Sequence, residues 1–137
     1  AGVTVTATPA RHFSGRFLTD RNTTLWCGYV LTEDQAASEG HRIYVGGDGG
    51  YSDLFREVGE RLGPFDVTLM EIGAYNKAWA DIHLGPEQAV QAALDAKARL
   101  LLPVHWATFD LALHGWTEPG ERILVAAREA GLPLALP

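Results

Sequence analysis

Hydrophobic positions along the chain follow two patterns. At 3–8 apolar and polar residues alternate with a period of two, as in a strand with one buried face. At 67–72 and 99–104 the apolar run is nearly unbroken, as in a strand that is buried on both faces. The segments at 25–31 and 42–45 are expected to pair as an antiparallel hairpin. The predicted strands are residues 3–8, 25–31, 42–45, 67–72, 99–104 and 132–136.

Three further segments have apolar residues at helical spacing. Ser52 is expected to cap the first helix, and a Gly-Pro pair ends it. Pro86 begins the second helix, and Thr117 is expected to cap the third, which ends at Gly131. Strands that alternate with helices indicate an α/β layered fold, and the early hairpin makes the sheet mixed rather than parallel.

Composition and charge limit the class of protein. The chain has 137 residues, enough for one compact domain, and a formal net charge of −6, which argues against a protein that binds nucleic acid or a polybasic membrane anchor. Cys27 is the single cysteine, so no internal disulfide forms. The apolar runs are too short for a transmembrane segment, no signal peptide is visible, and a cytoplasmic location is expected. The single methionine, Met70, and the abrupt ends favour a segment of a longer chain.

Three residues with metal-ligating side chains follow the ends of predicted strands: His12, Asp48 and His105. In a layered α/β protein the loops after strand ends gather along one rim, where ligands usually bind. Imidazole nitrogens and a carboxylate suit zinc or a similar metal, and the glycines around Asp48 allow a close approach. The alternative is a set of ordinary surface histidines and a glycine turn, because no short-range ligand pair supports a metal site.

Other functions of the glycine-rich segment 46–50 are disfavoured. The segment lacks the Lys-Ser/Thr of a phosphate-binding loop, the spacing of a dinucleotide fingerprint and the carboxylates of a calcium loop. His83 precedes the second predicted helix, whose start would suit a phosphate, but an exposed loop residue is an equal interpretation. The role of His114 is open.

Six short motifs occur in a fixed order along the chain. They are T-P-A-R-H-F at 8–13, G-G-D-G-G-Y at 46–51, G-P-F-D at 63–66, I-G-A-Y at 72–75, H-x-x-P-E-x-A-V at 83–90 and H-W-x-T-F at 105–109. Together they resemble the C-terminal half of the metallo-β-lactamase-fold hydrolases related to N-acyl-phosphatidylethanolamine phospholipase D. The resemblance extends from Thr6 to about Pro119. It implies half of a four-layer αβ/βα sandwich, with a mixed sheet, helices on one face and a two-metal site, usually zinc, at one edge.

The resemblance also implies roles for single residues. His12 would ligate one metal, Asp48 would bridge both, and His105 would ligate the second. His83 corresponds to a histidine close to the metals that takes part in catalysis, together with Asp48. Two aromatic residues are expected to line the cleft, although packing is an equal interpretation for both. They are Tyr51 and Tyr75.

The family's signature H-x-H-x-D-H, which supplies the other four ligands, does not occur in this sequence. Residues 1–137 are therefore expected to form a single segment, the C-terminal half of the domain, which is inactive alone. With the N-terminal half, two zinc ions would activate water to hydrolyse a small or lipid-like phosphodiester, lactone or related ester. The alternative is a non-catalytic binding module that homodimerises through the exposed face of its sheet.

Overall fold

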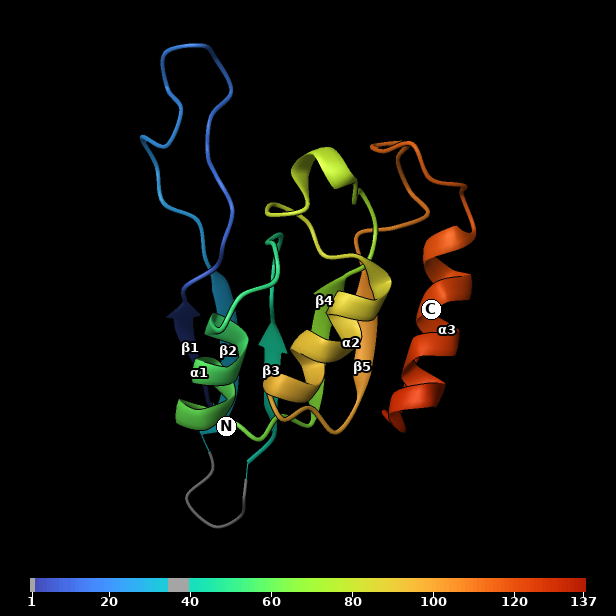
Figure 1. The fold of residues 1–137 in the computed structure, drawn as a ribbon. Coiled ribbons are helices and arrows are strands. Elements are labelled where there is room, and N and C mark those ends of the chain that lie inside the picture. Colours follow the sequence, from blue (N-terminus) through green and yellow to red (C-terminus); the bar gives the residue numbers. More distant parts are fainter. Residues whose placement is uncertain (1, 35–39) are drawn as a thin grey trace.

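The computed structural model describes residues 2–34 and 40–137 as one sheet with helices beside it (Figure 1). The five strands lie in the order β1-β2-β3-β4-β5. The first two neighbouring pairs are antiparallel and the last two are parallel, so the predicted mixed sheet and its early hairpin are confirmed. The elements are β1 (Gly2–Thr8), β2 (Gly28–Asp34), β3 (Arg42–Val45), α1 (Leu54–Arg61), β4 (Val67–Glu71), the 3₁₀ helix η1 (Lys77–Trp79), α2 (Pro86–Asp95), β5 (Leu101–Val104) and α3 (Glu118–Ala130).

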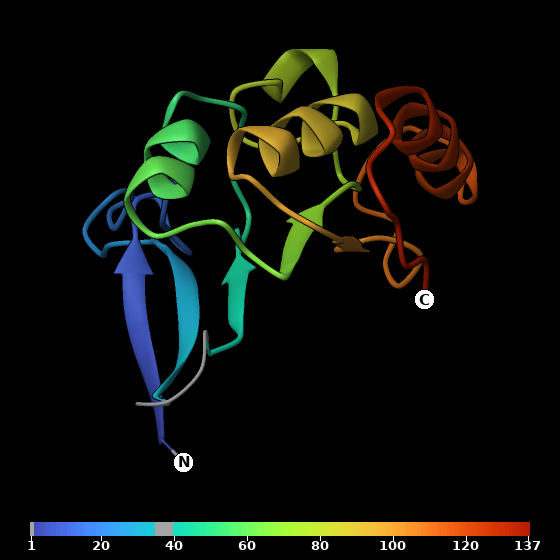
Figure 2. The same ribbon diagram turned by 90° about the horizontal axis from the view of Figure 1, so that it is seen from below.

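One face of the sheet forms the core. Residues that pair directly across neighbouring strands share a face, and Val30, Tyr44, Thr68 and Leu101 form such a row across β2 to β5. All four are buried. The apolar members of the row belong to the same cluster as apolar residues of α1, α2 and α3. Figure 2 shows the three helices on this one side of the sheet. The predicted placement of helices on one face is therefore confirmed.

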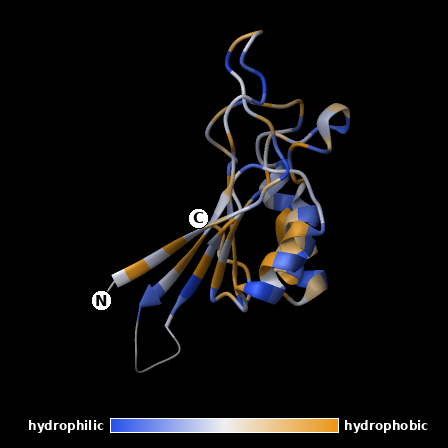
Figure 3. Cartoon of the chain, turned by 90° about the vertical axis from the view of Figure 1, so that its left-hand side faces the viewer, coloured by the Kyte–Doolittle hydropathy of each residue, from blue (hydrophilic) through white to orange (hydrophobic). Residues whose placement is uncertain are grey.

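The opposite face of the sheet is apolar, yet no described element covers it. Val5, Leu31, Ile43 and Val67 pair in a row across β1 to β4, and none of them is buried. Val5 keeps 59% of its surface exposed. Figure 3 shows the strands with helices on one side and the other side open. The strands predicted at 67–72 and 99–104 exist, but the expectation of burial on both faces is wrong, because the helices cover one face only. In β4 the residues left partly exposed are Val67 and Leu69, and in β5 they are Leu102 and Val104.

The helix ends follow the sequence signals in part. Pro86 occupies the first turn of α2, and Gly131, with φ of 66°, ends α3 in the left-handed conformation that favours glycine. The cap predicted at Ser52 is wrong, because Asp53 precedes α1 and the Ser52 hydroxyl makes no hydrogen bond with any described residue. Thr117 does precede α3, but it makes no side-chain capping bond. Its backbone is already helical, whereas a capping side chain needs an extended backbone.

Two predicted strands differ from the observed ones by three residues or more, and the strand predicted at 99–104 begins two residues later, at Leu101. The second strand begins at Gly28 rather than at residue 25, because its pairing with β1 starts where Gly28 faces Thr8. The strand predicted at 132–136 is reduced to a single parallel bridge between Leu134 and Leu101. None of the helices in the described part of the chain combines the length and the apolar character that a bilayer crossing requires.

Candidate metal centre

A pocket of about 480 Å³ opens at the rim where the strands end. The rim collects the ends of β1, β3, β4 and β5 because β1 and β3 are both antiparallel to β2, and β3 to β5 are parallel. Figure 1 shows the loops that follow these strands at one end of the sheet. The residues that line the pocket are His12, Phe13, Asp48, Ala74, Trp79, Ile82, His83, His105 and Leu111. The four polar residues predicted for the site therefore share one pocket.

Asp48 and His105 face each other across this pocket. The Nε2 atom of His105 lies 3.6 Å from Oδ2 of Asp48, and its Nδ1 atom lies 3.6 Å from Oε2 of Glu71. His105 follows β5 directly and has a φ of 60°. A left-handed backbone at a residue other than glycine costs on the order of 1 kcal/mol, and such strain persists mainly at functional sites.

His12 presents one nitrogen without a partner. Its Nδ1 atom lies 2.8 Å from the carbonyl oxygen of Phe13, which can only accept, so Nδ1 carries the proton. Nε2 is then an acceptor. It is buried and has no hydrogen-bond partner among the described residues. The His12 ring stands edge-on to the ring of His83, with 5.3 Å between centroids. A buried, unpartnered imidazole nitrogen in a pocket with a carboxylate fits a metal ligand.

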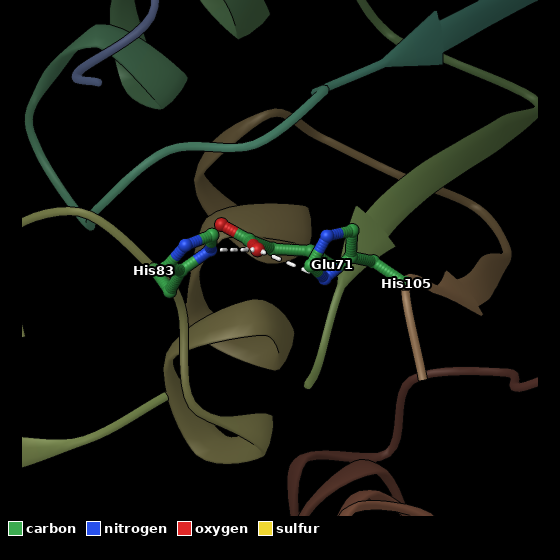
Figure 4. Close-up of side chains that lie close together, drawn as sticks. All are labelled: Glu71, His83 and His105. Atoms are coloured by element: carbon green, nitrogen blue, oxygen red, sulfur yellow. Dashed lines mark hydrogen bonds and ion pairs between the residues drawn. The ribbon is translucent and has the colours of Figure 1, made fainter. Parts of the chain in front are cut away.

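Glu71, the last residue of β4, was not predicted as a site residue, and it lies at the base of the site. Its Oε1 atom accepts the backbone N–H groups of Gly49, at 2.7 Å, and Leu84, at 3.2 Å. Its Oε2 atom lies 2.6 Å from Nδ1 of His83 (Figure 4). This hydrogen bond raises the pKa of His83 above its ordinary value, against the opposing effect of burial. The sequence contains one indication of this role: Glu71 lies in an apolar strand, and a buried carboxylate needs buried hydrogen-bond partners.

Glu71, His83 and His105 also form a cluster with metal-binding potential. One donor atom from each residue lies within 4.8 Å of the others. Figure 4 shows both imidazole rings turned toward the carboxylate between them. The rings of His83 and His105 stack with 5.5 Å between centroids.

The structure does not bring the two predicted cleft tyrosines into the pocket. The Tyr51 hydroxyl donates to Asp95 at 2.5 Å, and this bond raises the pKa of Tyr51 to about 12. The Tyr75 hydroxyl donates to Glu118 at 2.7 Å, and burial, with this bond, raises the pKa of Tyr75 to about 12. His114 stacks on Tyr75 with 4.4 Å between centroids. Neither tyrosine lines the pocket, so substrate contact stays a prediction for both.

Comparisons with known proteins identify the family and the fold of the chain. The family model described as "Beta-lactamase superfamily domain" matches residues 1–106. An uncharacterized protein of Mycobacterium tuberculosis is 51% identical over 138 residues, which cover 98% of this chain and 36% of that protein. N-acyl-phosphatidylethanolamine-hydrolyzing phospholipase D 1 of Caenorhabditis elegans is 35% identical over 133 residues, which cover 93% of this chain and 36% of that protein. The structure of Igni18, a metallo hydrolase from Ignicoccus hospitalis, matches 99% of this chain and 50% of its own with a TM-score of 0.72 at 22% identity.

The chain therefore spans about a third of the length of these two relatives and half of Igni18. At 22% identity, the likeness to Igni18 shows a shared fold.

Proposed function

Because the chain belongs to the β-lactamase superfamily domain family and has the metallo-β-lactamase fold, we propose that it forms part of a metal-dependent hydrolase. In this proposal, residues 1–137 are one segment, the C-terminal half of the catalytic domain. The observation that carries the proposal is the pocket that His12, Asp48 and His105 share, in which a buried imidazole nitrogen lacks a hydrogen-bond partner among the described residues.

In the proposed site, His12 would hold one zinc ion, His105 would hold a second, and Asp48 would bridge them. Two bound metal ions lower the pKa of a water molecule and polarise the oxygen of the bond to be cleaved. Three side chains are too few to enclose two metal ions, since a zinc site usually has four ligands. The remaining ligands would therefore come from the N-terminal half of the domain.

His83 would serve the reaction as a proton donor. Its Nδ1 atom is committed to Glu71 at 2.6 Å, so Nε2 is the nitrogen left to meet a substrate oxygen. The raised pKa of His83 favours its protonated form, in which Nε2–H donates to the departing oxygen. Asp48 would take part in catalysis by fixing the separation of the two metal ions.

The apolar wall of the pocket supports a small or lipid-like ester or phosphodiester as the substrate. Phe13, Trp79, Ile82 and Leu111 line the pocket beside the polar groups. The phospholipase D of C. elegans hydrolyses N-acyl-phosphatidylethanolamine, as its name states. A lactone or a related ester would meet the same requirements, and a cytoplasmic location remains part of the proposal.

The open face of the sheet supports a partner for this half-domain. The row that contains Val5 and Leu31 is apolar and is covered by no described element. Exposed apolar patches of this kind mark interaction sites. We propose that the N-terminal half of the domain covers this face. A second copy of the chain, related by a two-fold axis, is the alternative that the same face favours.

Two preparations test the proposal: the chain alone, and the chain joined to the natural sequence that precedes it. Zinc binding is measured by equilibrium dialysis, and hydrolysis is measured with a nitrophenyl phosphodiester, a nitrophenyl ester and a lactone. We expect weak zinc binding and no turnover for the chain alone, and about two zinc ions and turnover for the joined form. A joined form that binds no zinc would refute the proposal. A stable, metal-free dimer of the chain alone would favour the binding module.

A further inference from the structure

Glu71 meets three segments of the pocket rim at once. Its Oε1 atom holds the β3–α1 loop through the amide of Gly49, the residue next to Asp48. The same atom holds the segment before α2 through the amide of Leu84, the residue next to His83. Its Oε2 atom faces the imidazole nitrogens of His83 and of His105, which follows β5. One carboxylate therefore contacts every segment that carries a polar group of the pocket except that of His12.

The bonds around Glu71 leave little capacity for a metal ion. A carboxylate offers about four lone-pair positions. Two N–H groups occupy Oε1, His83 occupies one position on Oε2 at 2.6 Å, and Nδ1 of His105 approaches the other at 3.6 Å. The side chain is 1% exposed. Coordination through Oε1 would break bonds to two buried backbone amides, and coordination through Oε2 would compete with His83. An unsatisfied buried donor costs about 1–3 kcal/mol.

The orientation of the two rings points to a different role. Both imidazoles turn Nδ1 toward Glu71, so Nε2 of each ring is free for the pocket, and Nε2 of His105 lies 3.6 Å from Asp48. A carboxylate that accepts from one ring nitrogen fixes the tautomer and direction of the ring, and prepares the other nitrogen to bind a metal or substrate. His105 Nδ1 has no hydrogen bond to any described residue, so Glu71 offers the acceptor that it lacks.

We infer that Glu71 is a positioning residue rather than a metal ligand: it holds His83 as the Nδ1–H tautomer through a hydrogen bond, favours the same tautomer of His105 through its negative charge at 3.6 Å, and ties the Asp48 loop to the same carboxylate. One consequence of this role rests on the proposed hydrolase function: Nε2 of His105 serves as the metal ligand, and Nε2 of His83 meets the substrate. The tautomers themselves are a property of this chain and do not depend on a bound metal.

The substitution Glu71→Gln separates the two roles. The Gln carbonyl oxygen would keep the bonds from Gly49 and Leu84, because two N–H donors cannot face an NH₂ group. The NH₂ group would then face Nδ1 of His83, which must become an acceptor and pass its proton to Nε2. The variant therefore preserves the shape of the site and reverses the tautomer of His83.

The test uses imidazole ¹⁵N chemical shifts of the complete protein without metal, at a pH where both histidines are neutral, and zinc affinity measured against a chromophoric chelator. We expect Nδ1–H at His83 and His105 in the wild type and Nε2–H at His83 in Glu71→Gln. We also expect zinc affinity to fall about 10- to 100-fold, as it does when an outer partner of a ligand is lost. Asp95→Asn is the matched control, because Asp95 accepts a tyrosine hydroxyl away from the pocket, and it should change neither measurement.

Two results would overturn the inference. The first is an Nε2–H tautomer at His83 in the wild type, a measurement that stands even if Glu71→Gln does not fold. The second is a loss of zinc affinity in Glu71→Gln beyond about 1,000-fold with unchanged tautomers, which would identify Glu71 as a ligand, since an outer partner contributes about 10- to 100-fold. A wild type with the expected tautomers but no zinc binding would refute the proposed function and support the positioning role.

Discussion

Gly50→Ala is a sharp test of how the rim of the pocket is assembled. Gly50 packs against the backbone of Asp81, two residues before His83. An alanine Cβ at position 50 would overlap the carbonyl group of Asp81 and lie 3.0 Å from its Cα atom. Backbone atoms cannot swing aside as the end of a flexible side chain can, so the loop that carries His83 must move.

The size of the effect follows from the contacts in place. Relief of the overlap requires a displacement of about 1 Å, and overpacking of this kind costs about 1–3 kcal/mol of unfolding free energy. A displacement that reaches His83 in full and points away from Glu71 would lengthen the 2.6 Å bond between them to at most roughly 3.6 Å, which is beyond hydrogen-bond range. It would also stretch the 2.9 Å ion pair between Arg11 and Asp81. Gly50→Ala should therefore lower both the unfolding free energy and the zinc affinity of the site.

Gly49→Ala provides the control, since it makes the same change one residue earlier in the same loop. Its Cβ would lie 3.4 Å from the nearest backbone atoms of Arg11, an ordinary contact. Thermal unfolding and zinc affinity of the complete protein are measured for both variants. We expect a loss of about 2–6 °C in Tm for Gly50→Ala and a much smaller change for Gly49→Ala. Equal melting temperatures and equal zinc affinities for the two variants would refute the reasoning.

Three further predictions concern other residues. His12→Ala should lower zinc affinity more than 100-fold, beyond the roughly 10- to 100-fold effect of an outer partner, and unchanged affinity in a chelator competition would exclude His12 as a ligand. Tyr51→Phe should lower the unfolding free energy in urea by about 1 kcal/mol, because Asp95 loses a donor, and should leave KM unchanged; a raised KM would mean that the tyrosine contacts substrate. The backbone amide of Arg42 holds the pKa of Asp66 below its usual value. Ionised Asp66 therefore stabilises the fold at pH values above its unfolded pKa of about 4, and this stabilisation is lost as the pH falls through its folded pKa. Asp66→Asn should flatten the fall of Tm with acid below about pH 4, and parallel Tm curves for the two proteins would contradict this.

The features that the sequence predicted well depend on local pattern and on sheet topology. Alternation and apolar runs located the five strands of the sheet, because burial on a pleated surface imposes a period of two. The shared rim followed from one further rule, that ligands gather where parallel strands end. His12 joins Asp48 and His105 at that rim because β1 runs parallel to β3, a consequence of two antiparallel pairings in succession.

The features that the sequence did not reveal depend on contacts between distant segments. Pattern alone cannot tell that the Tyr51 hydroxyl meets Asp95 at the end of α2. Glu71 interrupts an apolar strand, and only the fold brings two amides and two imidazoles around it. The cap predicted at Ser52 failed for a related reason, since the start of α1 depends on the backbone angles of the preceding loop.

Burial and strain divide the site into a fixed side and an open side. On the fixed side, the buried carboxylate of Glu71 holds two segments by backbone amides, and Arg11 ties the segment of His12 to Asp81. His105 keeps a left-handed backbone there, a cost on the order of 1 kcal/mol that rigid surroundings can sustain. On the open side, Asp48 leaves 45% of its side chain exposed. In the proposed site Asp48, which faces His105, would bridge the two metal ions from this open side, and the ligands that the N-terminal half is proposed to supply would enter there.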